Sequence, residues 1–301
     1  MSYRGSAVRR GEWLEVMPGK LPQHPDSPRS AVRQWLIDTL GMPPKMLSRL
    51  EHEDGIKLAG DRIRIRLFPP RDYGFEPCWT GIDVLYEDDY CLVVHKPAGM
   101  KVHPTGDERQ PTLAHVVAAH YMGQGEQAAV RHIHRLDEFT SGPVLYAKNE
   151  FAQLILDEAM STKKIERVYV AVVQGIVQSP AFRVEAPIGR DRHHAKRQRV
   201  SDTGKPAATL VTLLDTLRDA SLVRLTLETG RTHQIRVHMS HIGHPLIGDA
   251  LYGGSTRYFN YQALHGESLI FPHPLTGEIL NIKDPWPEEF IELHRRLLPE
   301  S

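Results

Sequence analysis

Asp137 lies in a short polar segment, residues 134–142, that leads into the apolar stretch Pro143–Ala147. The Thr-Ser-Gly triplet that closes this segment favours a turn, so we expect Asp137 on a loop just before a strand. Loops held by rigid strands are common positions for catalytic groups. Taken alone, however, Arg135 and Asp137 are better explained as a structural ion pair beside a turn.

Two further segments carry residues of interest. The stretch Arg167–Gly175 alternates like a strand, and its Tyr169 is by itself more typical of a half-buried strand tyrosine than of a catalytic one. The stretch Leu227–His238 turns at a glycine and then becomes helix-like. Its many polar side chains are Arg231, His233, Arg236 and His238. Such crowding indicates a site for an anion or for a metal ion.

The strongest basic cluster lies between residues 190 and 205, where six lysines and arginines stand against two aspartates. The six are Arg190, Arg192, Lys196, Arg197, Arg199 and Lys205. Such a cluster can bind the phosphates of a nucleic acid. Without the neighbouring motifs, a solvated, charged hairpin would be the favoured explanation of the same residues.

The elements that must position these residues indicate one α+β domain over residues 79–301. Its strands do not alternate regularly with helices, which disfavours a doubly wound parallel sheet. The expected strands are Ile82–Tyr86, Tyr90–His95, Pro143–Ala147, Val168–Val173, Ala207–Leu214 and Leu222–Leu227. The expected helices are Thr112–Tyr121 and Phe151–Met160.

Residues 12–78 are expected to form a small separate module. Ser27-Pro28 is a good N-cap and first-turn pair for a helix that Gly41 can end, and Pro43-Pro44 can start a second helix. The stretch Ile56–Leu67 then predicts a hairpin with one apolar face and one arginine face.

Two short helices followed by a basic hairpin resemble, in degenerate form, the αL RNA-binding module of ribosomal protein S-four. Arg62, Arg64 and Arg66 could therefore contact RNA. They could also form a solvated edge face that discourages edge-to-edge sheet pairing. Residues 69–74, rich in proline and glycine, read as a linker to the larger domain.

The composition is that of an ordinary soluble protein. The 301 residues include 37 basic and 37 acidic ones, so any contact with nucleic acid depends on local clusters. Residues 1–11 lack the apolar core of a secretory signal, and no apolar run approaches the ~20 residues that span a bilayer. Cys78 and Cys91 match no zinc spacing or disulfide framework. We therefore expect a cytoplasmic protein with reduced thiols and no membrane contact.

Together, the three polar segments resemble the RluA-type family of pseudouridine synthases, in the family's order and from about Ile82 to the C-terminus. Further matches are Lys96–Met100 with His103-Pro104, Pro187–Arg190, Gly204-Lys205, Leu264-His265 and Phe271–Pro274. His95 and Arg167 replace a common asparagine and a common lysine. The resemblance implies an isomerase that converts uridine in structured RNA to pseudouridine. It also implies a mixed, mainly antiparallel sheet and no metal or organic cofactor.

The resemblance assigns roles to single residues. Asp137 would be the nucleophile that forms a covalent adduct, on either the sugar or the uracil, and Arg236 would favour its ionised form. Arg135 would fill the space left by the flipped-out nucleotide or hold that nucleotide, and Tyr169 would stack on the uracil and assist a late proton movement. The loop and pocket would be shaped by His134, Thr140, Ser141, Gly142, Gly230, Arg231, His233 and Gln234.

The same residues allow two other interpretations. A metal-dependent hydrolase could use His132, His134, His233 and His238 with Asp137 or Asp249, but their spacing matches no metal motif. A non-catalytic RNA-binding scaffold should have lost Asp137, Tyr169 or Arg236, and all three are present. Members of the resembled family act on large-subunit ribosomal RNA or on transfer RNA, and the N-terminal module favours ribosomal RNA. A monomer is expected.

Overall fold

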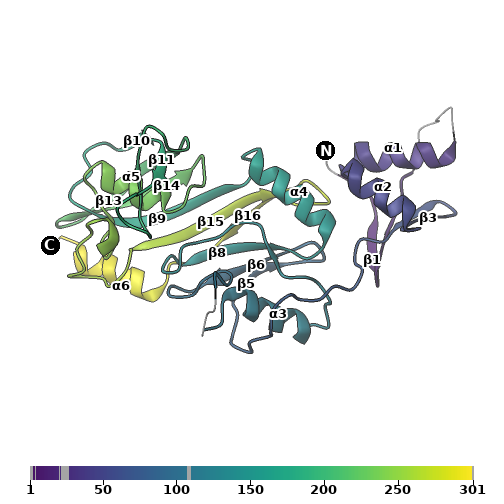
Figure 1. Cartoon of the computed structure of the whole chain (residues 1–301), viewed down its shortest axis with the longest axis horizontal. Helices are drawn as coiled ribbons and strands as arrows, with labels where there is room; N and C mark the ends of the chain where they lie inside the picture. The colour runs from purple at the N-terminus through teal and green to yellow at the C-terminus, as the bar shows by residue number, and fades with distance from the viewer. Residues whose placement is uncertain (1–2, 4, 20, 22–26, 107–109, 300–301) are drawn as a thin grey trace.

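The computed structural model describes residues 3, 5–19, 21, 27–106 and 110–299. A large α+β domain carries a small N-terminal module at one end (Figure 1). All named strand pairs of the described chain are antiparallel. The expected fold class, α+β with mainly antiparallel sheets, is confirmed.

A six-stranded sheet, in the order β10-β13-β14-β9-β15-β16, forms one half of the large domain. Its strands are β9 (Glu166–Gln174), β10 (Ala181–Glu185), β13 (Ala208–Thr216), β14 (Ala220–Leu227), β15 (Leu264–Pro272) and β16 (Ile279–Lys283). Successive strand side chains point to opposite faces. On β9, Val170 and Val172 therefore pack with helix α6 (Glu288–Leu297), while Tyr169, Ala171 and Val173 pack on the other face. Helix α5 (Gln234–His241) packs on that second face, and Tyr169 and Ile235 line a pocket there.

A four-stranded sheet, in the order β5-β6-β8-β7, forms the other half. Its strands are β5 (Val84–Glu87), β6 (Cys91–Lys96), β7 (Arg131–His132) and β8 (Gly142–Ala147). Helix α3 (Leu113–Gly123) shares a core with one face of this sheet, and α4 (Glu150–Ser161) shares a core with the other.

The two sheets of the large domain meet at one very close approach. A parallel bridge joins Ser141 to His265, and a Cβ on Gly142 would lie 2.7 Å from the backbone of Gly266. Gly142 also has a positive φ of 136°, which a residue with a side chain rarely adopts. Glycine is therefore required at this junction, five residues beyond Asp137.

The N-terminal module contains a four-stranded sheet, in the order β1-β2-β4-β3, and two helices. Its elements are β1 (Ala7–Arg10), β2 (Trp13–Val16), α1 (Pro28–Leu40), α2 (Pro44–His52), β3 (Ile56–Ala59) and β4 (Arg62–Ile65). Ser27 caps α1 by accepting a hydrogen bond from the Ser30 N–H, as its sequence predicts. The sheet begins at Ala7, upstream of the expected start at residue 12, and residues 20 and 22–26 lie outside the described residues.

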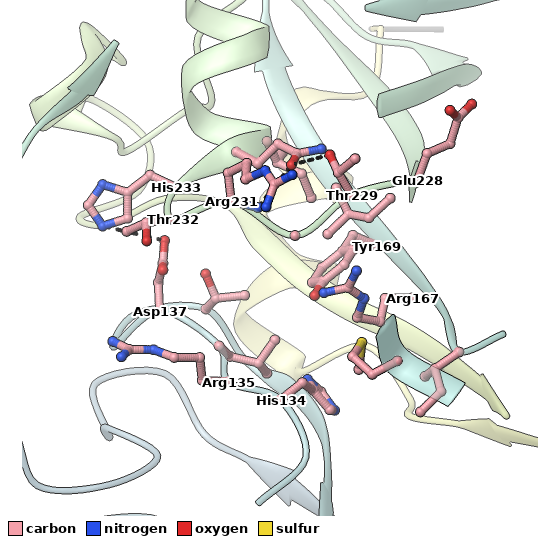
Figure 2. Close-up of a pocket in the computed structure, with 18 of the residues that line it drawn as sticks. His134, Arg135, Asp137, Arg167, Tyr169, Glu228, Thr229, Arg231, Thr232 and His233 are labelled. Carbon is pink, nitrogen blue, oxygen red and sulfur yellow. Dashed lines mark hydrogen bonds and ion pairs between the residues drawn. The ribbon is translucent and has the colours of Figure 1, made fainter. Parts of the chain in front are cut away.

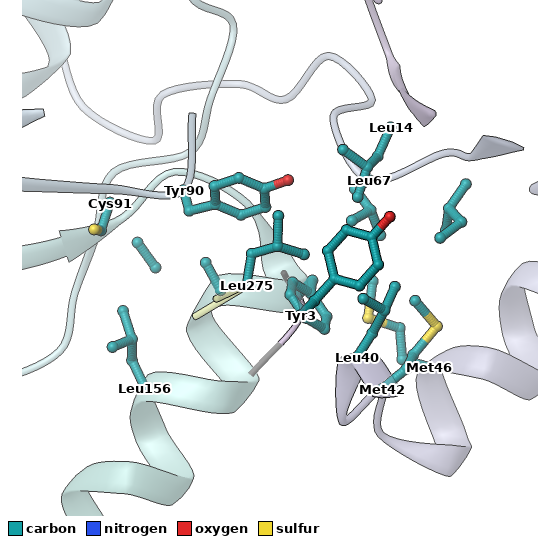
Figure 3. Close-up of a cluster of buried hydrophobic side chains, with 14 of the residues drawn as sticks. Tyr3, Leu14, Leu40, Met42, Met46, Leu67, Tyr90, Cys91, Leu156 and Leu275 are labelled. Atoms are coloured by element: carbon teal, nitrogen blue, oxygen red, sulfur yellow. The ribbon is translucent and has the colours of Figure 1, made fainter. Parts of the chain in front are cut away.

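The module and the large domain share a hydrophobic core. Figure 3 shows buried side chains of both parts in one cluster. Its labelled members are Tyr3, Leu14, Leu40, Met42, Met46 and Leu67, together with Tyr90, Cys91, Leu156 and Leu275 of the large domain. Two bidentate ion pairs add polar contacts, Arg9 with Glu126 at 2.6 Å and Arg49 with Glu150 at 2.8 Å.

A two-stranded hairpin, β11 (Ile188–Arg190) and β12 (Gln198–Val200), projects beside α5 and the short 3-10 helix η1 (Ala250–Tyr252). Its base packs through Ile188, Val200 and Tyr252. A Cβ on Gly204 would lie 2.5 Å from the backbone of Ile188, so the returning chain presses closely on β11.

The predicted strands and helices are all confirmed, with ends that shift by a few residues. The sequence does not predict β15, because Gly266 and Glu267 interrupt its apolar alternation. Gly266 serves the sheet junction, where a Cβ would lie 2.9 Å from Pro143 Cδ. Cys78 and Cys91 are unpaired thiols. No helix in the described part of the chain is long and apolar enough to cross a membrane.

Candidate active site

A pocket of about 460 Å³ opens between the loop before β8, strand β9 and the loop before α5 (Figure 2). The three polar segments of the sequence converge on it. Ten of the site residues predicted from them line the pocket: His134, Arg135, Asp137, Thr140, Tyr169, Gly230, Arg231, His233, Gln234 and Arg236. Ser141, Gly142 and His238 do not line it. Loops distant in sequence therefore place a carboxylate, a phenol and several cations around one space.

The loop that carries Asp137 is held from behind by Lys96. This lysine is fully buried, and its Nζ donates to the carbonyl oxygens of Pro97, Met100 and Glu138 at 2.8, 2.6 and 2.9 Å. Burial lowers the pKa of Lys96 to about 7, although the charges of Asp137 and Glu138 act in the opposite direction. The backbone beside Asp137 is thus fixed by a cation that never reaches the pocket.

Arg236, on α5, lies against the carboxylate of Asp137. Its Nη1 donates to Asp137 Oδ2 at 3.1 Å, while Nε and Nη2 form a bidentate pair with Asp249 at 2.6 and 2.9 Å. Burial alone would lower the pKa of Arg236, but hydrogen bonding to Asp249 and the charges of Asp249 and Asp137 raise it. The guanidinium is held by Asp249 and stabilises negative charge on Asp137.

Side chains alternate between the two faces of β9, so Tyr169 points to the face opposite to Val168 and Val170. That face borders the pocket. It is 6% exposed, and burial raises the pKa of its phenol. Its hydroxyl makes no hydrogen bond to another residue of the described chain. A buried phenol without a protein partner is available to a ligand.

Three buried polar side chains fix the loops around the pocket. His134 Nε2 accepts a hydrogen bond from the Leu145 N–H at 3.2 Å, and burial lowers the pKa of His134 to about 3, so it stays neutral. Gln234 accepts from the Arg231 N–H at 3.0 Å and donates to the Ala208 carbonyl at 2.9 Å. Thr140 accepts from the Gln262 amide at 3.3 Å. These hydrogen bonds hold the loops that line the pocket.

Several cations of the pocket have no carboxylate partner within ion-pair distance among the described residues. They are Arg135, Lys163, Arg167 and Arg231. Gly230 makes room for Arg167, since a Cβ there would lie 2.5 Å from Arg167 Nη1. A pocket lined by unneutralised cations favours a polyanionic ligand.

The basic cluster of residues 190–205 does not line this pocket. Arg190, Arg192 and Lys196 are exposed on the β11–β12 hairpin. Arg197 turns inward instead, with its guanidinium 5.5 Å from the centre of the Tyr252 ring and 3.9 Å from Asp191. The hairpin forms a separate basic surface beside the pocket.

Comparisons with known proteins agree with this geometry. Residues 89–241 match the family model for RNA pseudouridylate synthase. The Bacillus subtilis RNA pseudouridine synthase YhcT is 42% identical over 78% of this chain and 79% of its own length. The ribosomal large subunit pseudouridine synthase D of Haemophilus influenzae is 35% identical over 93% of this chain and 92% of its own.

The chain belongs to the RluA-type RNA pseudouridine synthases. A solved structure shares the fold of the synthase: human RNA pseudouridylate synthase domain containing 4, with a TM-score of 0.60 and 25% identity. The similarity covers 71% of this chain and 92% of the human one. The expected isomerase class is thereby confirmed.

The histidines considered for a metal site do not converge in the synthase. His238 is buried between Thr209 and the Ala186 carbonyl, and His132 stacks on His103. In the described chain, the side chains that could jointly hold a metal are instead Asp88, Cys91 and His273. Asp88 already accepts hydrogen bonds from Tyr86, Tyr90, Cys91 and His273, which is a structural arrangement.

Sequence reasoning missed several residues of the site. Asp249 was considered as a metal ligand, and the structure places it on Arg236 instead. Lys96 lies in a segment that matches the family, but no pattern in the sequence indicates its contacts or those of Tyr252. Lys163, two residues beyond the end of α4, carries no signal at all because it belongs to no motif.

Proposed function

We propose that this synthase converts specific uridines of large-subunit ribosomal RNA to pseudouridine, with Asp137 as the nucleophile acting on a flipped-out base. The observation that supports the catalytic part is the Asp137 carboxylate at the pocket wall. Its Oδ2 accepts from Arg236 at 3.1 Å, and its side chain is 24% exposed, so a substrate can reach it.

The side chains of the pocket suit each step of such a reaction. A covalent adduct at Asp137 would hold the nucleotide while the base leaves its nitrogen-linked bond, rotates and is reattached through carbon. The buried phenol of Tyr169 offers an aromatic face to the uracil and a hydroxyl for proton movement late in the reaction. Arg135, exposed beside Asp137, is placed to fill the space that the flipped nucleotide leaves.

The pocket also suits RNA in size and charge. A volume of about 460 Å³ falls within the usual range for one small ligand, such as a nucleotide. The unneutralised cations Lys163, Arg167 and Arg231 are placed to contact phosphates that flank the target. The exposed arginines of the β11–β12 hairpin extend this basic surface away from the pocket.

Ribosomal RNA is the favoured substrate because relatives that match most of this chain are named for it. The large subunit pseudouridine synthases D of Haemophilus ducreyi and Haemophilus influenzae align with 89% and 93% of the chain. Transfer RNA is the competing substrate, and the experiment below separates the two.

The test is pseudouridine mapping on total RNA from cells with and without the gene. The deletion strain is complemented with the wild-type gene, with Asp137→Asn, or with Asp83→Asn as a matched control. Asp83 is an exposed carboxylate outside the pocket. We expect one or a few sites in large-subunit RNA to disappear on deletion and to return with the wild-type gene and Asp83→Asn only.

Other outcomes discriminate between parts of the proposal. Sites lost from transfer RNA alone would overturn the substrate and leave the catalytic assignment standing. Rescue by Asp137→Asn would overturn the nucleophile. A map without any change would contradict the substrate and the mechanism together.

A further inference from the structure

We propose that Tyr252 and His233 form a positioning pair that orients the carboxylate of Asp137 and links it to the basic β11–β12 hairpin. The inference rests on the proposed role of Asp137 as the nucleophile. Neither residue needs to react, because both would act through Asp137. Figure 2 shows His233 and Asp137 facing each other across the wall of the pocket.

The proton on His233 is fixed by Tyr252. The Tyr252 hydroxyl accepts a hydrogen bond from the Gln198 N–H at 2.9 Å and lies 2.8 Å from His233 Nδ1. A phenol has one proton, and in the described chain Nδ1 is the acceptor within its reach. Tyr252 therefore donates to Nδ1, and the neutral imidazole carries its own proton on Nε2.

That Nε2–H faces the nucleophile. His233 Nε2 lies 3.9 Å from Asp137 Oδ2, the same oxygen that accepts from Arg236 at 3.1 Å. A movement of about 1 Å would bring the imidazole into hydrogen-bond range. Both donors thus address Oδ2, and Oδ1 receives no hydrogen bond from the described residues. Oδ1 is left as the oxygen that meets the substrate.

The backbone of His233 is held in a conformation that residues with side chains disfavour. Its φ of 57° lies in the left-handed region, immediately before α5. The side chain is 17% exposed and packs edge-on against the Tyr252 ring, with ring centres 5.7 Å apart. The contact with Tyr252 therefore stabilises an unfavourable backbone that aims the imidazole at Asp137.

Tyr252 also contacts the β11–β12 hairpin. Gln198 is the first residue of β12, and the guanidinium of the preceding Arg197 lies 5.5 Å from the centre of the Tyr252 ring. The guanidinium of Arg236 lies 4.9 Å from the same ring. An RNA phosphate on the exposed hairpin arginines would thus act on the residue that orients His233. Binding of RNA to the hairpin would thereby influence, through Tyr252 and His233, the orientation of the Asp137 carboxylate.

The first test measures the tautomer of His233 in the full chain without RNA. The ring nitrogens of ¹⁵N-histidine-labelled protein are observed by NMR, and His233→Gln assigns the signals. We expect a protonated Nε2 and an unprotonated Nδ1 in the wild type, and a mixture of tautomers in Tyr252→Phe. A proton on Nδ1 in the wild type would overturn the proposal, whether or not the proposed reaction is correct.

The second test separates positioning from binding. Tyr252→Phe keeps the ring and removes the hydroxyl, and Tyr258→Phe is the matched control, since its hydroxyl makes no hydrogen bond to the described residues. We expect the single-turnover rate on the host's large-subunit ribosomal RNA to fall about tenfold to a hundredfold in Tyr252→Phe, with an unchanged Kd. An increase in Kd as large as the fall in rate would contradict the proposal, and so would a rate equal to that of Tyr258→Phe. A wild-type enzyme inactive on this RNA would contradict the proposed function and leave the NMR result to decide the pair.

Discussion

The N-terminal module and the pocket both carry several arginines, but they neutralise them differently. In the module, Arg10, Arg62 and Arg64 all lie within 3.5 Å of Glu15, and Arg66 lies 2.7 Å from Glu12. In the pocket, Arg135, Arg167 and Arg231 have no carboxylate within ion-pair distance in the described chain. An arginine-rich strand is therefore not by itself an RNA-binding surface, because the charge that RNA meets is what remains after pairing.

The module still offers one feature that suits RNA. Lys57 and Arg64 lie 4.8 and 5.4 Å from the centre of the Trp13 ring. An aromatic ring with cations can stack on a base. The cations there are partly satisfied by the ring and by Glu15, however, so we expect the module to contribute less to RNA affinity than the pocket does.

The largest expected effect concerns the one pocket arginine that is fully paired. Arg236→Met leaves Asp249 and Asp137 without their shared cation, so we expect a loss of about 3–5 kcal/mol in the free energy of unfolding. Activity should fall at least about a hundredfold, because the cation beside the proposed nucleophile is gone. Urea unfolding and single-turnover assays measure the two effects.

Arg64→Met in the module is the matched control for this change. Its pair with Glu15 is partly exposed, so we expect a change of at most about 1 kcal/mol and normal activity. Equal losses in the two variants would remove the distinction between the module and the pocket.

An intermediate effect is expected at Lys96, a cation that pairs with carbonyl oxygens instead of carboxylates. Lys96→Met leaves those carbonyls without a donor and should cost about 3 kcal/mol of stability. The folded pKa of Lys96, about 7, lies below the unfolded value of about 10.4.

The pH dependence at Lys96 follows from that difference. Between these two pH values the unfolded chain binds more protons, so the stability of the wild type relative to Lys96→Met should rise with pH across this window. Denaturant unfolding from pH 6 to pH 10, with both proteins side by side, measures the trend. If the stability difference between the wild type and Lys96→Met shrank with pH, Lys96 would remain protonated among its carbonyl partners over this range.

The smallest effect tests the comparison most directly. Arg167→Gln should lower the slope of log affinity against log salt by about 0.7–0.9, because one phosphate contact is lost. Arg62→Gln in the module should leave the slope close to that of the wild type, because Arg62 already pairs with Glu15 at 3.5 Å and with Asp61 at 3.8 Å. Fluorescence anisotropy with the large-subunit ribosomal RNA over a range of salt concentrations gives both slopes. A larger change in Arg62→Gln would place the main RNA contact on the module.

Much of the fold follows from local patterns. Ser27 and Gly41 bound α1 as their capping chemistry requires, and the alternation in β9 places Tyr169 on the pocket side. Strand β15 is not predicted from the sequence, because glycine at position 266 is required by the close packing of two sheets and interrupts the apolar pattern of the strand. Local patterns fail where the residue type is set by packing against a part of the chain that is distant in sequence.

Local sequence patterns established the fold class, the family and ten of the residues that line the pocket, because turns, alternation and family motifs involve neighbouring residues. The tertiary structure decided which charges remain unpaired and which side chains orient one another. Glu15 pairs with arginines of a strand some fifty residues away, and Gly230 makes room for Arg167. Tyr252 brings a hairpin amide to His233. Ion pairs and hydrogen bonds act over a few ångströms, so only the folded chain decides which groups meet.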